Sequence, residues 1–310
     1  MHYTLHQLQI YVKVTQNKSI TKAAEDLHLT QPAVSIQLKN FQDQFDIPLT
    51  EIVGRQLYVT EFGEEIAKHA QEIIVNMEEI DARAQSFLGE LTGKLKIAVV
   101  STGKYVLPYF LSEFILKHEK VELVMDVTNK SQVIESLEKN EVDFAFVSIV
   151  PTHLSIHQVE LLHNDLYLVT SKNETFPAVH RSLNSLKKKS FIFREAGSGT
   201  RMITERYFDS HQLNIEKKLE LTSNEAVKQA VIAGLGCSIM PIIGIRNELT
   251  LNDLQIIPAK GLPIRSEWTL IYHKGKKHSP VAKAFLKHLE ENKERIAEKH
   301  FGWISSYPGI

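Results

Sequence analysis

Cysteine and long apolar runs are scarce in this chain, and each scarcity excludes a class of protein. The 310 residues contain one cysteine, Cys237, which excludes an internal disulfide and disfavours a sensor that cycles between thiol and disulfide. No apolar run approaches the length of a bilayer span, and the N-terminus lacks the basic and then apolar organisation of a signal peptide. We therefore expect a cytoplasmic protein with no membrane partner.

Excess charge and common catalytic motifs are also missing. The formal net charge of -1 fits neither a protein that coats a polyanion nor one that binds a membrane surface. The chain has no His-Glu-x-x-His or Gly-x-Ser-x-Gly, and its glycine-rich run at 197–200 lacks the Gly-Lys-Ser/Thr ending of nucleotide hydrolases. His153 and His157 are four residues apart, but Pro151 before them favours a loop over a metal site. We expect no catalytic residue, metal or cofactor.

A pair of short helices joined by a turn is predicted between Ser19 and Phe45. Ser19 can cap a helix that runs to Leu27, and Thr30 can cap the next helix. Pro32 fits the first turn of that second helix, where its missing N–H removes no hydrogen bond. The inward stripe of the second helix is expected to contain Val34, Leu38, Phe41 and Phe45. Polar side chains that could reach base edges are left outward: Gln31, Ser35, Gln37, Lys39 and Asn40.

An ordered series of residues in this region resembles the winged helix-turn-helix of the LysR-type transcriptional regulators. It comprises Ala23-Ala24-x-x-Leu27-x-Leu29-Thr30-Gln31-Pro32-Ala33-Val34-Ser35, Ile47-Pro48-Leu49 and Gly54-Arg55-x-Leu57-x-Val59-Thr60-x-x-Gly63. The chain departs from the family at Ile36, Thr50 and Ile52, where arginine, an aromatic residue and arginine are common. The resemblance implies that double-stranded DNA is contacted by Ser19, Thr21, Lys22, Thr30, Gln31, Pro32, Ser35, Lys39 and Arg55.

The charge of this first domain, residues 1–60, makes one copy insufficient for DNA binding. It contains five basic and five acidic residues, whereas affinity for DNA comes largely from neutralising phosphates. Near-neutrality favours the alternative of a protein-binding domain, but Lys22, Lys39 and Arg55 beside the presumed groove favour DNA. Useful affinity then requires two or more copies on one duplex.

A heptad pattern in residues 61–90 could supply the second copy. Apolar residues recur at alternating spacings of four and three over about three heptads, namely Ile66, Ala70, Ile73, Met77, Ile80, Ala84 and Phe87. The alternative is a helix docked on its own domain. The family resemblance also implies a dimerising linker helix, with Ile66, Ile73, Met77, Ile80 and Phe87 at the interface. We expect a homodimer, or a homotetramer, on an inverted-repeat operator, with RNA polymerase as a candidate further partner.

Beyond Gly93 the pattern alternates between strands and helices, which predicts a mostly parallel sheet with covered faces. Strands are expected at 94–100, 121–127, 142–147, 165–170, 190–194, 219–222, 237–240 and 267–272, and helices at 106–117, 131–139, 201–211, 224–233 and 280–299. Residues 91–310 resemble the two-lobed α/β periplasmic-binding-protein-like effector domain of the same family. The first lobe would comprise about 91–163 and 268–310, and the second about 164–267. The expected fold is thus multidomain: an all-α winged helix-turn-helix, a dimerising linker helix and this α/β domain.

Hydroxyl- and glycine-rich segments follow two predicted strands and open helices. They are Ser101-Thr102-Gly103 and Gly197-Ser198-Gly199-Thr200. Free N–H groups at helix N-termini and hydroxyl donors suit an anion. Ser148 matches the position from which the family often supplies a third hydroxyl. The resemblance therefore implies a small anionic effector between the lobes, at Ser101, Thr102, Ser148, Gly197, Ser198, Gly199 and Thr200.

The segment from Arg194 to Arg201 is similar to one in regulators of carbon fixation and sulfur assimilation, which favours a phosphorylated or sulfur-related effector. Taken alone, the glycine-serine run could equally be a flexible turn. The rival from another class is a group-transfer enzyme built on the same two lobes, but it does not explain residues 19–87.

Overall fold

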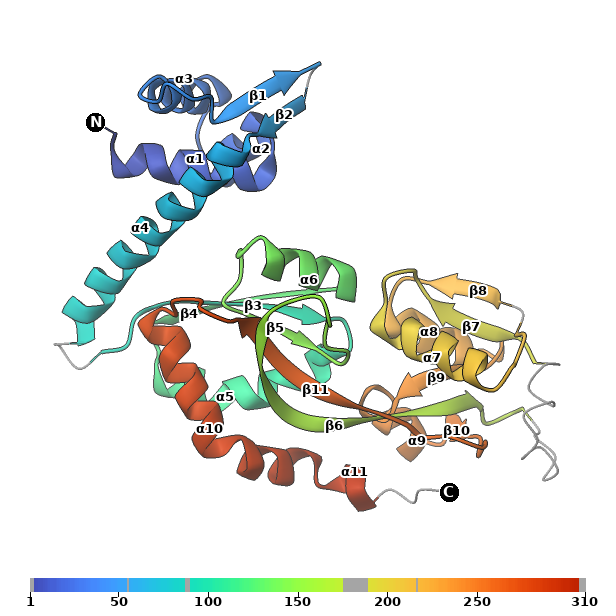
Figure 1. Ribbon diagram of the computed structural model, residues 1–310. Helices are drawn as coiled ribbons and strands as arrows, with labels where there is room; N and C mark the ends of the chain where they lie inside the picture. Colours follow the sequence, from blue (N-terminus) through green and yellow to red (C-terminus); the bar gives the residue numbers. More distant parts are fainter. Residues whose placement is uncertain (1–2, 55, 87–89, 175–188, 216, 307–310) are drawn as a thin grey trace. The chain divides into compact units, whose positions relative to one another are not determined.

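The chain divides into two compact units, Met1–Gly93 and Lys94–Ile310. The computed structural model describes residues 3–54, 56–86, 90–174, 189–215 and 217–306 (Figure 1). Among the described helices, none combines the length and apolar composition needed to span a membrane. Each unit is described separately below.

The N-terminal unit is a winged helix-turn-helix followed by a long helix. Its elements are α1 (Leu5–Asn17), α2 (Ile20–Asp26), α3 (Gln31–Gln42), β1 (Thr50–Val53), β2 (Gln56–Val59) and α4 (Glu61–Ser86). The two predicted caps are confirmed, because Ser19 accepts a hydrogen bond from the Lys22 N–H and Thr30 accepts one from the Ala33 N–H. β1 and β2 pair antiparallel as the wing, so the domain is not entirely helical.

The predicted inward stripe of α3 forms the centre of this unit's core. Val34, Leu38 and Phe41 are buried, and α1, which the sequence patterns did not reveal, covers them with Tyr11 and other apolar side chains. Phe45 lies beyond the end of α3 rather than on it. Its ring centroid is 5.2 Å from that of Phe41 and 6.1 Å from that of Phe62, so it still closes the core.

The apolar seam of α4 is divided between two environments. Ala70 is 2 % exposed and Ile66 is half-buried, because the first part of α4 packs on α1. Ile73, Met77 and Ile80 are 43 %, 40 % and 66 % exposed. Docking on its own unit thus accounts for the first part of the seam, whereas Ile73, Met77 and Ile80 in the second part are exposed among the described residues. Phe87 lies outside the described residues.

The C-terminal unit alternates strands and helices, as predicted. Its elements are β3 (Gly93–Val100), α5 (Leu107–Lys117), β4 (Val121–Thr128), α6 (Lys130–Glu138), β5 (Phe144–Val147), β6 (Ile156–Ser171), β7 (Phe191–Arg194), α7 (Gly199–Ser210), β8 (Lys217–Leu221), α8 (Asn224–Ile232), β9 (Ser238–Pro241), α9 (Arg246–Thr250), β10 (Leu254–Ile256), β11 (Ile264–His273), α10 (Pro280–Phe301) and α11 (Trp303–Ser306). Single 3-10 turns lie at Gly103–Tyr105 and Ile242–Gly244.

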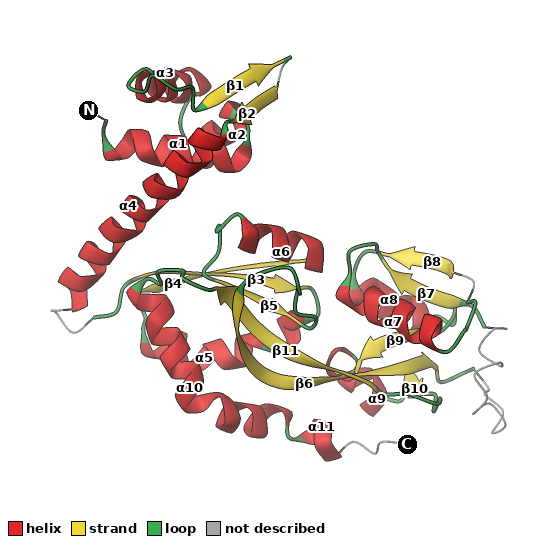
Figure 2. Ribbon diagram, viewed as in Figure 1, coloured by secondary structure: helices red, strands yellow, loops and turns green. Residues whose placement is uncertain are grey.

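The main sheet is mixed, and the prediction of a mostly parallel sheet was wrong. Its strand order is β10-β6-β11-β5-β3-β4, with β9 also paired to β6, while β7 and β8 form a second, parallel sheet. β3 and β5 are parallel, but β11 is antiparallel to both β5 and β6. The error arose in β6: its first half, from Ile156 to Asn164, is rich in polar residues because much of it is exposed. Figure 2 shows β6 and β11 running along both lobes.

The last strand and helix of the chain complete the first lobe, as the family resemblance implies. β11 pairs with β5, and α10 packs on α5 on one face of the sheet, opposite α6 (Figure 1). Trp268 is fully buried and its ring stacks on Phe146 at 5.4 Å between centroids. The ring centroid of Phe285 on α10 lies 5.3 Å from that of Phe114 on α5. This packing gives the strand ends a rigid base.

A close approach of backbone explains why position 63, in the first turn of α4, is a glycine. A Cβ at this position would lie 2.0 Å from the Leu49 carbonyl oxygen and 2.9 Å from Tyr11 Oη. Tyr11 Oη also donates a hydrogen bond of 2.7 Å to the Gly63 carbonyl. α4 can therefore meet the helix-turn-helix core only where the side chain is absent.

Gly63→Ala should loosen the N-terminal unit by about 1–3 kcal/mol, the usual cost of overpacking, because the obstacle is backbone rather than a flexible side chain. Amide hydrogen exchange should rise in α1 and stay unchanged in β11. Glu65→Ala, at an exposed position two residues further along the same helix, is the matched control. Unchanged protection of α1 in the glycine variant would refute the close approach.

Candidate functional site

A cleft in the C-terminal unit opens where four strands end and two helices begin. β3, β4, β5 and β7 end at its walls, and α6 and α7 begin there. Ligands of α/β proteins commonly sit outside the carboxyl ends of strands. The lining residues are Val100, Ser101, Thr102, Asn129, Lys130, Ser148, Arg194, Ser198, Gly199 and Thr200.

The structure brings nearly all of the predicted effector residues to this one cleft. The lining includes Ser101, Thr102, Ser148, Ser198, Gly199 and Thr200. Gly197 is not among the lining residues. Its φ is +86°, and a Cβ there would lie 2.8 Å from Ser131 Oγ, so Gly197 shapes the turn before α7.

Serine and threonine residues that are largely buried dominate the cleft wall. Thr102, Ser148, Ser198 and Thr200 are each less than a tenth exposed. Within the part of the chain that the structure describes, none of these four hydroxyls is hydrogen-bonded to another residue. Ser198 is the N-cap of α7, yet its side chain caps no N–H. These hydroxyls line the cleft and are available to a polar occupant, because each can donate one hydrogen bond and accept others.

Lys130 supplies a cation that the sequence patterns did not reveal. Its Nζ lies 3.8 Å from Met202 Sδ, and among the described residues no carboxylate pairs with it. Burial, together with the nearby Arg206, lowers the pKa of Lys130. Asn129 before it caps α6 by accepting a hydrogen bond from the Gln132 N–H at 3.0 Å. The available signal was the position of both residues directly after β4, at a third junction between a strand and a helix.

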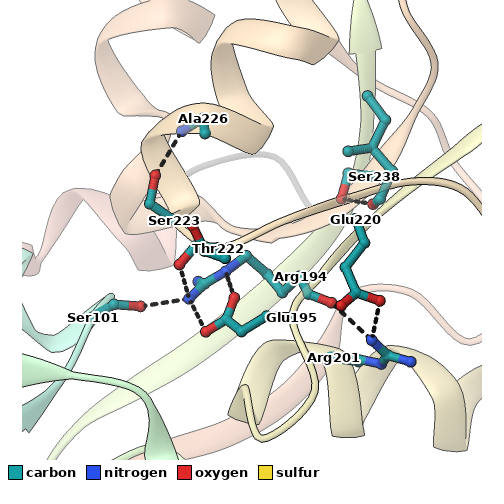
Figure 3. A network of polar contacts seen from close by, with 10 residues as sticks. Ser101, Arg194, Glu195, Arg201, Glu220, Thr222, Ser223, Ala226 and Ser238 are labelled. Atoms are coloured by element: carbon teal, nitrogen blue, oxygen red, sulfur yellow. Dashed lines mark hydrogen bonds and ion pairs between the residues drawn. The ribbon is translucent and has the colours of Figure 1, made fainter.

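Arg194 also lines the cleft, but its charge is already paired. Its Nε and Nη2 atoms donate to the two carboxylate oxygens of Glu195 at 2.8 and 2.9 Å. Nη2 also donates to Ser101 Oγ at 3.0 Å and to the Thr222 carbonyl at 3.4 Å (Figure 3). Arg194 therefore joins the end of β7 to the end of β3. The Ser101 hydroxyl oxygen already accepts a hydrogen bond from it.

Arg201, at the end of the predicted glycine-serine segment, is held by ion pairs within the fold. Its guanidinium pairs with Glu205 at 2.6 Å and with Glu220 at 2.7 Å. It also donates to the Arg194 carbonyl at 3.2 Å, as Figure 3 shows. These pairs hold α7 against β7 and β8, and they leave Lys130 as the lining cation without a carboxylate partner among the described residues.

The predicted DNA-contacting residues lie on α2, on α3 and in the turn between them. Thr21, Lys22, Gln31, Pro32 and Lys39 are exposed, and Ser35 is half-buried. The Ser19 and Thr30 hydroxyls serve as caps, and Arg55 lies outside the described residues. The outward assignment of Gln37 was wrong: it is half-buried and accepts a hydrogen bond from Gln7 Nε2 at 3.2 Å.

The two histidines weighed as metal ligands lie in different settings. His153 Nε2 is 3.0 Å from Glu138 Oε1, in the expected loop. His157 belongs to β6, where its ring contacts Tyr272. Over the described residues, no three histidine, cysteine or carboxylate side chains gather as a metal-binding group.

Two family models match the chain and together cover most of it. The model described as "Bacterial regulatory helix-turn-helix protein, lysR family" matches residues 5–64, and the "LysR substrate binding domain" model matches residues 88–294. The chain belongs to the LysR family of transcriptional regulators.

Curated relatives match the regulator along nearly its whole length. It is 35 % identical over 286 residues to a RuBisCO operon transcriptional regulator of Allochromatium vinosum, with 92 % of this chain and 95 % of the relative covered. It is 34 % identical over 295 residues to the HTH-type transcriptional activator CmpR of Synechocystis sp., with 95 % and 97 % covered.

Solved structures of LysR-family proteins share the fold. The regulatory domain of CcmR from Synechocystis PCC6803, solved in complex with 2-PG, is 32 % identical, with a TM-score of 0.61 over 66 % of this chain and 98 % of that domain. Full-length CbnR complexed with its target DNA is 20 % identical, with a TM-score of 0.58 over 93 % of this chain and 99 % of CbnR. The second likeness concerns the fold alone.

The thiol of Cys237 should be inert in the folded regulator. The residue is 1 % exposed, and burial raises the pKa of its thiol to about 12. Because the thiolate is the reactive form, iodoacetamide at pH 8 should leave the native chain unlabelled and label it after unfolding in urea. Rapid labelling of the native chain, measured by mass spectrometry, would contradict this packing.

Proposed function

We propose that this LysR-family regulator responds to a small phosphorylated carboxylate, of the class of 2-phosphoglycolate, held between the two lobes of its C-terminal unit. The observation that carries the proposal is a cleft lined by four hydroxyls and by Lys130, where among the described residues the hydroxyls have no hydrogen-bond partner and the ammonium has no carboxylate partner. Support comes from the CcmR regulatory domain, which has been solved with 2-PG and is 32 % identical.

The donors of the cleft fit a phosphate group. Phosphate oxygens accept hydrogen bonds from hydroxyls, and charge-assisted bonds of this kind are about twice as strong as neutral ones. Lys130 at the start of α6 would balance negative charge, and the N-terminus of α7 at Ser198 adds its helix dipole. Among the described residues that line the cleft, none is a histidine or a carboxylate that could serve as a general base. The cleft is therefore better interpreted as a binding site than as the active site of a group-transfer enzyme.

The ligand would bridge the lobes. Thr102, Ser148 and Lys130 belong to the first lobe, while Ser198 and Thr200 belong to the second, with the lobes bounded as expected at about 91–163 with 268–310 and at 164–267. The binding free energy then depends on the angle between the lobes, so binding would favour one arrangement of the regulator over another. Relatives named for the RuBisCO operon agree with the similarity of residues 194–201 to carbon-fixation regulators.

On the DNA side, we propose a homodimer formed through the exposed part of the α4 seam, bound to an inverted repeat, with assembly to a tetramer and contact to RNA polymerase as further steps. A formally neutral DNA-binding domain needs avidity, which two linked copies supply. Gln31, Ser35 and Lys39 would then enter the major groove from each copy.

Thr102→Val and Thr200→Val preserve side-chain shape and delete one donor each. Each should weaken 2-phosphoglycolate in calorimetry by about 1–3 kcal/mol, the usual value of a hydrogen bond to a charged group. Lys130→Met should weaken it further by removing the balancing charge. Thr250→Val, the same change on exposed α9, should bind like the parent. If the parent binds 2-phosphoglycolate and all three cleft variants bind it equally well, the site lies elsewhere.

Replacing both Ile73 and Ile80 by aspartate should give monomers in sedimentation and abolish DNA binding at physiological salt, because two charges would enter the proposed apolar interface. The paired control is His69→Asp with Asn76→Asp, at exposed polar positions of the same helix. Parent-like DNA affinity of the isoleucine double variant would mean that α4 does not carry the dimer.

A further inference from the structure

An apolar side chain lies at the middle of the outward face of α3. Val34, Leu38 and Phe41 are buried on the opposite side of this helix. With 3.6 residues per turn, the side of the helix opposite these three residues carries Pro32, Ile36 and Lys39, and Ile36 is nearest to its centre. Ile36 is 58 % exposed there, whereas Gln31 and Ser35 lie nearer the flank. The residue best placed to reach beyond the helix thus carries no hydrogen-bonding group.

Scattered exposed apolar residues are common on protein surfaces, so exposure alone assigns nothing to Ile36. Its setting is more specific. It sits between Pro32 and Lys39 on the second helix of the helix-turn-helix, within the residues matched by the lysR-family DNA-binding model. Ile36 is therefore continuous with the surface that faces DNA in the proposed complex.

The major groove offers one apolar group to such a side chain, the C5-methyl of thymine. We propose that Ile36 packs on a thymine methyl in each half-site and thereby determines sequence preference at that base pair. The inference rests on the proposed DNA-binding function and adds to it a contact distinct from the polar ones of Gln31 and Ser35. Cytosine at the same place would present an amino donor to a side chain with no acceptor.

The methyl group alone can be tested, because uracil differs from thymine only by lacking it. Duplexes are first selected from a random-sequence pool with the full chain, and each dT is then replaced by dU in turn. With the parent, one position in each half-site should lose about fourfold in affinity, the equivalent of roughly 0.8 kcal/mol for one buried methyl-sized group. Other thymines should tolerate uracil.

The same series measured with Ile36→Ala isolates the pairwise contact. The alanine variant should bind thymine and uracil at that position with equal affinity, and Ile36→Val should retain part of the difference. Leu251→Ala, which removes an apolar side chain 71 % exposed on the other unit, should keep the full uracil penalty. Near-ultraviolet circular dichroism checks that each variant is folded.

Two outcomes overturn the assignment of Ile36: no uracil penalty with the parent, or a penalty that persists unchanged in Ile36→Ala. If the full chain selects no sequence from the pool, sequence-specific DNA binding itself fails, and the inference fails with it. The first two results leave DNA binding intact, so the two failures are distinguishable.

Discussion

The antiparallel pairing of β6 with β11 is the constraint on which the C-terminal unit depends. The two strands stay paired from Ile156–His273 to Leu166–Ile264, so backbone hydrogen bonds run from one lobe into the other. β5 joins this pair through β11, and β9 joins it through β6. Because this pairing, with one register shift between Trp268 and Thr269, supports both lobes, the ends of β3, β4, β5 and β7 meet at the same cleft. Hydroxyls that lie almost a hundred residues apart in the chain thereby face the same cleft.

Two cations line the cleft: Arg194, which is paired with a carboxylate, and Lys130, which has no carboxylate partner among the described residues. Arg194 is neutralised by Glu195 and ties Ser101 to β7, so it fixes the geometry of the lobes at this point. Lys130 has no such carboxylate among the described residues, and burial already lowers its pKa. An anion would restore the balance that burial disturbs, since a buried charge is tolerated when it is paired. This difference separates Arg194, a structural cation, from Lys130, the cation of the proposed ligand site.

Local signals in the sequence predicted much of this regulator. The caps Ser19 and Thr30, the inward stripe of α3 and the hydroxyls of the cleft depend on residues close together in the chain, and the structure places them as expected. The polar half of β6 was missed because exposure masks strand periodicity. The bond from Arg194 to Ser101 and the place of Lys130 beside Met202 were missed because each joins residues that are distant in sequence. The predicted inward stripe of α3 already defines the opposite, outward face, and the structure adds that Ile36 is 58 % exposed on it.

The central claim is that a ligand in the cleft and DNA on α3 bind with linked energies. The most direct measurement is the dissociation constant of 2-phosphoglycolate for the full chain, determined without DNA and again with a saturating amount of a selected duplex. Linkage requires DNA to change ligand affinity by the same factor by which the ligand changes DNA affinity, typically about 5- to 150-fold in allosteric proteins. The account predicts two clearly different constants that satisfy this equality. Identical ligand affinity with and without bound DNA would contradict it.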